Sequence, residues 1–82
     1  MYHDFDESVD VVAVFEGRVL RPLRFRWKGN RHKIIKVTNA WRAHKGDDLE
    51  RHFACLDSEG NAFELAYNDR RTDWRLLKLW VE

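Results

Sequence analysis

Several residue types are scarce in this sequence, and each scarcity excludes a class of structure. Cys55 is the only cysteine, which excludes an internal disulfide and a cysteine-based zinc site and fits a reducing compartment. The four glycines are isolated, so no glycine-rich phosphate-binding loop is present. No apolar run is long enough to span a membrane, and the acidic first ten residues lack the basic and apolar parts of a signal peptide. We therefore expect a cytoplasmic protein with no membrane partner.

Acidic residues are missing from the middle of the chain, although the net charge of the whole is only +1. Residues 1–16 hold five acids and no Lys or Arg, which gives −5. Residues 17–46 hold ten Lys or Arg and no acid, which gives +10. Residues 47–82 hold nine acids and five bases, which gives −4. The charge is segregated along the chain, as is typical of proteins that bind a charged partner.

The length and composition predict one small folded domain. A chain of 82 residues has room for a single hydrophobic core, and 44% hydrophobic and 13% aromatic residues are too many for a disordered segment. The first eight residues contain three acids and no Lys or Arg. We interpret residues 1–8 as an acidic, mobile N-terminal tail and residues 9–82 as a single small β domain.

Alternation in residues 21–28 predicts a strand with one buried and one solvated face. Leu23, Phe25 and Trp27 occupy odd positions. Arg24, Arg26 and Lys28 occupy the even positions. After Gly29 the odd positions are again apolar at Ile35, Val37 and Trp41, whereas Ile34 breaks the pattern. The odd-numbered residues of two paired strands can lie on the same face only if the connecting loop has an odd number of residues. The pattern therefore favours a three- or five-residue turn, with Gly29 in a left-handed conformation, over a two-residue Gly-Asn turn.

The remaining segments predict further strands, with two helical alternatives. Alternation before and after Gly60 indicates a second hairpin. Residues 48–57 could instead form a helix that starts with a capping box. Residues 73–81 are apolar at both odd and even positions and could form a helix capped by Thr72. We favour strands in both segments. The predicted fold class is all-β: five to six short antiparallel strands in a meander, as a rolled sheet or a small, SH3-like, partly open barrel, with a short C-terminal helix as an alternative.

A longer pattern of glycines and aromatic residues points the same way. It consists of Phe25-x-Trp27-x-Gly29, Val37, Trp41, Phe53, Gly60, Phe63-Glu64-Leu65-x-Tyr67 and Trp74-x-Leu76. This pattern resembles a family of small bacterial domains that has no established activity. The resemblance covers residues 22–80, and because its matching positions are turn glycines and core aromatics, it implies a fold rather than a function. It favours a strand at residues 50–57.

Candidate catalytic and metal-binding residues do not form a recognisable site. The four histidines lack the spacing of metal ligands. Cys55 occupies an odd position, which the alternation predicts to face the core, and a thiol there packs as a small apolar group. The acids Asp47, Asp48 and Asp69 lie in predicted turns, where hydrogen bonds to the backbone explain them. We therefore expect no catalytic residue, no metal and no cofactor.

The basic middle segment is the candidate functional feature. A stripe of cations on one face of a hairpin is typical of proteins that follow a nucleic-acid backbone. The predicted phosphate contacts, to DNA or RNA, are Arg24, Arg26, Lys28, Arg31, Lys36 and Arg42. We assign Trp27 and Trp41 to the core rather than to base stacking. In the alternative, neighbouring acidic strands neutralise the basic face, and the domain binds a protein partner or forms a homodimer.

Overall fold

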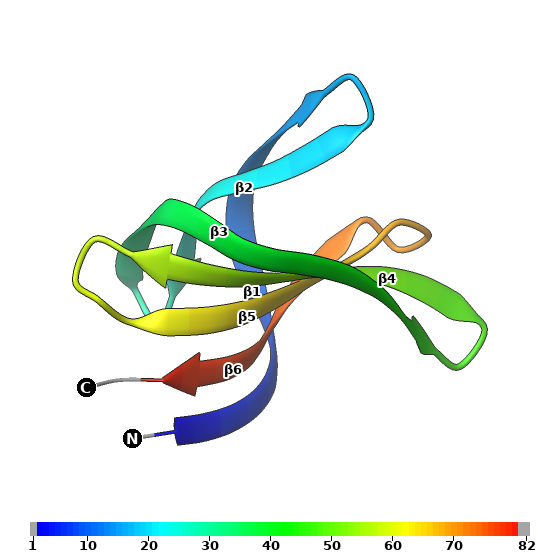
Figure 1. Ribbon diagram of the computed structural model, residues 1–82. Helices are drawn as coiled ribbons and strands as arrows, with labels where there is room; N and C mark the ends of the chain where they lie inside the picture. Colours follow the sequence, from blue (N-terminus) through cyan, green and yellow to red (C-terminus); the bar gives the residue numbers. More distant parts are fainter. Residues whose placement is uncertain (1, 81–82) are drawn as a thin grey trace.

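The computed structural model describes residues 2–80, which form six antiparallel strands and no helix (Figure 1). The strands are β1 (Tyr2–Glu16), β2 (Val19–Trp27), β3 (Asn30–Lys45), β4 (Asp48–Asp57), β5 (Ala62–Asn68) and β6 (Asp73–Trp80). Each strand pairs with the next, and β6 pairs with β1, which closes the ring. The all-β prediction is confirmed. Residues 48–57 and the described part of 73–81 are strands, so both helical alternatives are wrong; Val81 lies outside the described residues.

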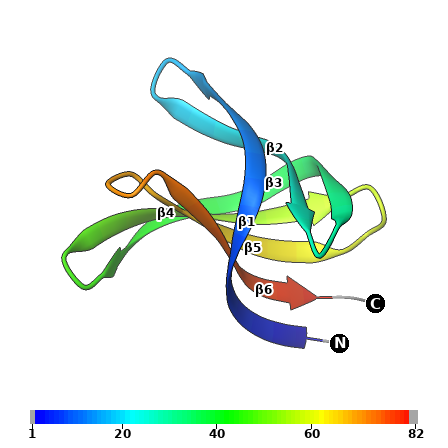
Figure 2. The ribbon, with the colours of Figure 1, turned by 180° about the vertical axis from the view of Figure 1, so that it is seen from behind.

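Two long strands, β1 and β3, give the ring its open shape. The first part of β1, up to Val9, pairs with β6, and the second part, from Asp10, pairs with β2. Only the first four residues of β3 pair with β2, and the rest of β3 pairs with β4. The β1–β2 and β3–β4 hairpins therefore diverge and project from the same end of the molecule, while both termini lie towards the other end (Figures 1 and 2).

The N-terminal residues have a place in this sheet. Residues 2–8, which the sequence predicts as a tail, form the first half of β1 in the structure. Glu7 lies opposite Leu76 and Ser8 opposite Arg75, so this segment closes the ring against β6. Asp6 is on the outer side of the sheet, where it pairs with Lys45 and Arg75. Glu7 shares the face of Leu76 and accepts a hydrogen bond from Trp27 Nε1. The prediction of a tail rests on the acidic composition of this segment and does not include its ion pairs with other strands.

The turn between β2 and β3 differs from the prediction. It contains two residues, Lys28 and Gly29, because Trp27 lies directly opposite Asn30. Gly29 is left-handed as predicted, with φ 76°, and Lys28 is left-handed as well, with φ 51°. This is the pattern of a type I′ turn, whose twist matches that of the flanking strands. The parity argument fails because β3 contains two bulges, one at Ile35 and one at Thr38, which move the following side chains to the opposite face.

The core contains Phe25 of β2 and the aromatic and aliphatic side chains that alternation predicts on β4 and β5. Its buried members are Leu20, Phe25, Phe53, Cys55, Phe63, Leu65, Leu76 and Leu79. The predicted inward placement of Leu23 is wrong, because Leu23 is the extra residue of the bulge in β2 and is 40% exposed. Cys55 is 1% exposed, and burial raises the pKa of its thiol to about 12. The prediction that Cys55 packs in the core is therefore confirmed. The described residues contain no helix that could cross a membrane.

Candidate nucleic-acid interface

Two pairs of cations face each other across β2 and β3. Arg24 lies directly opposite Lys33, and Arg26 lies directly opposite Arg31. Directly opposed residues of an antiparallel pair share a face, and the residue between Arg24 and Arg26 is Phe25, which is 2% exposed and points into the core. The four cations therefore point outward together. We call Arg24, Arg26, Arg31 and Lys33 the basic face.

The turn and the inner side of the ribbon hold the basic face in place. The type I′ turn fixes the register that opposes these residues. On the inner side, the His32 ring stacks on Phe25 with ring centroids 4.8 Å apart. The backbone N–H of Ser58 donates to the carbonyl of Lys33 at 3.2 Å, which ties the beginning of β3 to the β4–β5 loop. The basic face is thus carried by a ribbon that is held on its inner side and at its β3 edge.

Asp57 anchors the loop that supports this ribbon. Its carboxylate is buried and accepts hydrogen bonds from the backbone N–H groups of Glu59 and Asn61, at 2.9 and 2.8 Å. His32 Nδ1 lies 3.5 Å from the other oxygen. Burial on its own would raise the pKa of Asp57, but the hydrogen bonds from Asn61, Glu59 and His32 hold it below its usual value. Asp57 therefore stays ionised and fixes the loop next to Lys33.

The basic face is only partly neutralised. Asp10 of β1 lies opposite Arg26, and Arg26 Nη2 is 2.7 Å from Asp10 Oδ2. Arg24, Arg31 and Lys33 form no ion pair with any residue that the structure describes. Four cations and one acid leave a charge of about +3 on this face. Three of the four cations border a surface pocket of about 260 Å³, lined by Asp10, Val11, Val12, Arg24, Phe25, Arg26 and Arg31.

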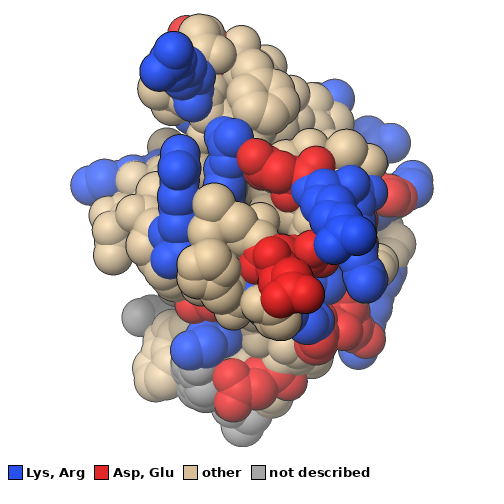
Figure 3. Space-filling view, turned by 90° about the vertical axis from the view of Figure 1, so that its right-hand side faces the viewer, with Lys and Arg blue, Asp and Glu red and all other residues tan. Residues whose placement is uncertain are grey.

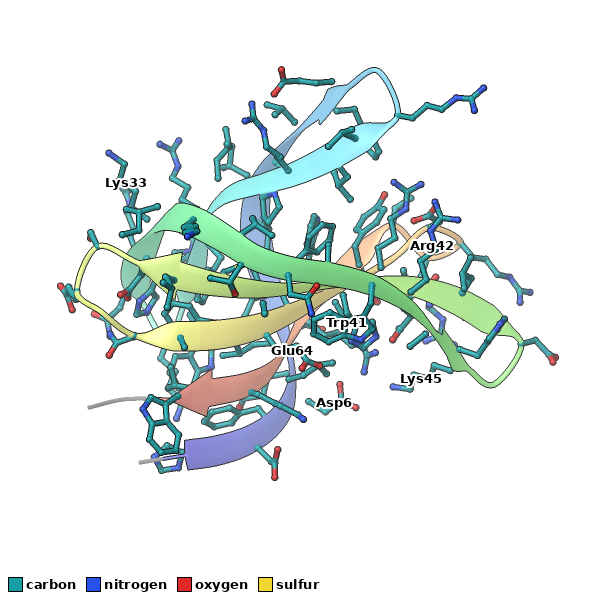
Figure 4. The ribbon with its side chains drawn as sticks, viewed as in Figure 1. Asp6, Lys33, Trp41, Arg42, Lys45 and Glu64 are labelled. Carbon is teal, nitrogen blue, oxygen red and sulfur yellow. The ribbon has the colours of Figure 1, made fainter. Side chains whose placement is uncertain are left out.

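The six predicted contact residues do not all lie together. The structure brings Arg24, Arg26 and Arg31 onto one face, and Lys28 lies at the adjoining turn with its Nζ 4.8 Å from the Trp27 ring centroid. Lys36 follows on β3 beyond the first bulge, opposite Leu56. Arg42 is at the far end of β3, opposite Arg51, and Figure 4 shows it on the opposite side of the molecule from Lys33. The predicted single stripe is therefore divided, and Arg42 does not belong to the basic face.

Lys33 is a member of the basic face that the predicted contacts omit. The only signal that could place it there is the length of the turn, because a two-residue turn makes it the cross-strand partner of Arg24. The parity of the apolar residues on β3 conceals this register. Ile34 faces the core two residues after His32, and the bulge at Ile35 leaves the Ile35 side chain 60% exposed.

The aromatic residues near the basic face do not offer a stacking surface. Trp27 packs edge-on against Phe5, at 5.0 Å between ring centroids, and its Nε1 donates to Glu7 at 2.7 Å. The assignment of Trp27 to the core is confirmed, because it packs against the buried cluster. The same assignment is wrong for Trp41, which is 37% exposed and lies over His52 on the outer side. The bulges in β3 account for that difference.

Many other cations of the molecule are paired with acids, although Arg18, Lys28, Lys36 and Arg42 form no ion pair with any residue that the structure describes. Figure 3 shows blue and red side chains next to each other over much of the side where the hairpin loops project. The cross-strand and loop pairs there include Arg51 with Asp69 at 2.8 Å and Arg70 with Asp48 at 3.1 Å. Hydrogen bonds from Asn68 and Arg70 hold the pKa of Asp48 below its usual value. The basic face differs from these pairs because it groups three cations, Arg24, Arg31 and Lys33, for which the described residues supply no acid.

No protein-family model, curated protein or solved structure matches this chain. The family resemblance in the sequence therefore stays a prediction. The function proposed below rests on the residues of the basic face themselves.

Proposed function

We propose that the protein is a non-enzymatic, cytoplasmic nucleic-acid-binding module and that its basic face binds the phosphate backbone of DNA or RNA. The observation that carries this proposal is the pair of directly opposed cations on β2 and β3. Like charges in directly opposed positions destabilise a sheet, each by up to about 1 kcal/mol. A bound polyanion would turn this repulsion into attraction, because each phosphate can lie between two cations.

The surroundings of the basic face support contacts with phosphates rather than with bases. Trp27, the aromatic residue at the end of the ribbon, already contacts Phe5, donates to Glu7 and has Lys28 Nζ 4.8 Å from its ring centroid. The ribbon is also flanked by β1 on one side and by the β4–β5 loop on the other. Three adjacent strands span about 10 Å before side chains are counted, which nearly fills a major groove about 12 Å wide. The face is therefore suited to lie across the backbone, with little dependence on sequence.

Salt dependence is the first test. Three to four phosphate contacts predict that log K falls with log salt with a slope of about −3 for duplex DNA. Fluorescence anisotropy of a labelled 20-base-pair duplex, measured between about 50 and 200 mM salt, checks this value. Parallel titrations with single-stranded DNA and with RNA identify the preferred form. Absence of binding to all three at the lowest salt concentration would refute the proposal.

Substitution of Arg24 separates binding from folding. In Arg24→Glu, the new carboxylate faces Lys33, so a repulsive pair becomes attractive and the free energy of unfolding rises by about 0.5 kcal/mol. The same substitution removes a phosphate contact, so we expect weaker binding and a salt slope that is smaller by about 1. Arg70→Glu is the control, because it changes the net charge by the same amount outside the basic face, in a loop where Arg70 pairs with Asp48. If both variants lose affinity equally, the protein responds to net charge alone and the basic face is not the site.

A further inference from the structure

The second half of β1 has an edge without a partner strand. Pairing with β6 ends at Val9, which lies opposite Trp74, and residues 10–16 pair only with β2. Together with β2 they form the hairpin that projects from the body of the molecule (Figure 2). No strand in the described part of the chain covers the other edge of residues 10–16.

Free edges elsewhere in the molecule carry features that prevent strand pairing. The unpaired edge of β2, residues 19–23, contains Pro22, which lacks an N–H group. The unpaired edge of β3 contains the bulges at Ile35 and Thr38. Prolines, bulges and cations are the usual protection of an exposed edge. Residues 10–16 have the sequence DVVAVFE and contain no proline, glycine, lysine or arginine. The bulge between β1 and β2 also leaves β1 regular, because the extra residue is Leu23 of β2.

The position of Pro22 reveals which backbone groups of β1 point away from β2. Pro22 lies opposite Ala13, and a proline in a strand is tolerated where its nitrogen faces away from the partner. Ala13 and Pro22 are therefore a non-hydrogen-bonded pair, and the N–H and C=O of Ala13 point to the free edge. Alternation gives the same direction to the backbone groups of Val11 and Phe15.

We propose that a second copy of this chain pairs with this edge, antiparallel and centred on Ala13. In this arrangement Ala13 faces Ala13 of the second copy, and Val11 faces Phe15 of the second copy. All of these residues have their N–H and C=O groups directed at the partner, so the three pairs form about six backbone hydrogen bonds. The interface is isologous, because the same segment serves both copies.

The side chains of the segment suit a second copy of the same sequence. Val12 is 46% exposed and meets Val14 of the second copy on the outer face, where two β-branched residues form a favourable pair. Asp10 meets Glu16 of the second copy at each end. Each of these acids already pairs with an arginine of its own β2, Asp10 with Arg26 and Glu16 with Arg21. Charges of alternating sign therefore surround each end of the interface.

Dimerisation would bring two basic faces together. Antiparallel pairing about a two-fold axis keeps the outer faces of both sheets on the same side. The result is one continuous sheet of six strands, three from each copy, with the cations of both copies on one surface. The dimer stands on the geometry of the β1 edge, so it is independent of the proposed binding of nucleic acid.

A cysteine at the two-fold axis tests the arrangement directly. Directly opposed, hydrogen-bonded residues have Cα atoms about 5.5 Å apart, within the range that a disulfide spans. We expect Ala13→Cys to form a covalent dimer under mild oxidation, seen as a doubling of the 9.9 kDa mass on a non-reducing gel. Ile35→Cys, which places an exposed thiol at the bulged edge of β3, is the matched control and stays monomeric. The unaltered chain is a second control, because its only thiol, that of Cys55, is 1% exposed.

Sedimentation of the unaltered chain tests the association without any substitution. A short edge-to-edge interface is a weak one, so we expect the mass to rise towards a dimer at about 0.1 mM and above. Val12→Lys places a charge beside the edge and should shift this rise to at least tenfold higher concentration, with an unchanged circular dichroism spectrum. A monomer at every concentration, or equal crosslinking of Ala13→Cys and Ile35→Cys, would overturn the proposal.

Discussion

Arg75 and Glu50 form a buried ion pair whose loss should destabilise the protein strongly. Arg75 on β6 reaches Glu50 on β4 across the outer side of the sheet, over the small side chain of Ala66, which lies opposite Arg75. Arg75 Nη2 lies 2.6 Å from both oxygens of Glu50, and the two side chains are only 13% and 4% exposed. Burial on its own would lower the pKa of Arg75, but its bonds to Asp6 and Glu50 raise it above the usual value. Arg75 therefore stays charged.

The substitution Arg75→Met keeps most of the apolar stem and removes the charge. Loss of one partner of a buried pair costs about 3–5 kcal/mol, because the other charge stays buried without compensation. His52 Nε2 remains 3.5 Å from Glu50, so we expect the lower end, about 3 kcal/mol. A chain of 82 residues has a free energy of unfolding of about 4–12 kcal/mol, so the variant loses a large part of its stability. The melting temperature should fall by about 12–24 °C.

Urea and thermal unfolding, followed by circular dichroism, measure this loss. Arg70→Met is the matched control, because Arg70 is 78% exposed and its pair with Asp48 contributes at most about 1 kcal/mol. Adding Glu50→Gln to Arg75→Met removes the isolated charge and should restore about half of the lost stability. Equal melting temperatures for Arg75→Met and Arg70→Met would refute the reasoning. A double variant no more stable than Arg75→Met would show that packing, and not charge, is responsible.

Three further predictions concern single residues. The lowered pKa of Asp57 means that its stabilising effect is complete above the usual value of 3.8 and is lost as the pH falls below it, so Asp57→Asn should unfold more easily at pH 7 and depend less on pH in acid titrations. Cys55, buried with a raised pKa, should react with a thiol reagent only after unfolding, and fast labelling of the native chain at pH 8 would contradict its place in the core. Lys28→Asn should stabilise the protein by about 0.5–1 kcal/mol in urea titrations, because asparagine tolerates the left-handed conformation better than lysine does.

The strands could be predicted from the sequence because they depend on local alternation. Phe25 between two arginines, and the alternating apolar residues of β4 and β5, indicate their inward faces without further information. The register of β3 could not be predicted, because it depends on where the strand bulges. Ile35 and Trp41 share the parity of Val37, yet the bulges place these two on the outside and Val37 against the core. A bulge and a turn of different length can produce the same spacing of apolar residues, so the sequence does not distinguish them.

The candidate site could be predicted only in part for the same reason. Arg24, Arg26 and Arg31 follow from the basic composition of the hairpin, whereas Lys33 and Arg42 are placed by the register and the length of β3. The role of Arg75 was not visible at all. Its partner Glu50 is 25 residues away and meets it across β5, and its partner Asp6 is 69 residues away and meets it because the sheet closes into a ring.

Two local features of β1, β2 and β3 work against the stability of the isolated monomer. Opposed cations on β2 and β3 repel each other, and the unprotected edge of β1 leaves backbone groups without a partner strand. On the opposite part of the ring, β4, β5 and β6 satisfy their charges internally, as in the pair of Arg75 with Glu50. Arg42 of β3 also lies opposite Arg51 of β4, but Arg51 pairs with Asp69, whereas the described residues supply no acid for Arg24, Arg31 or Lys33. The segment of β1, β2 and β3 thus combines both unfavourable features, and we propose it as the surface that binding partners would use, with an anion on its outer face and a second chain at its edge.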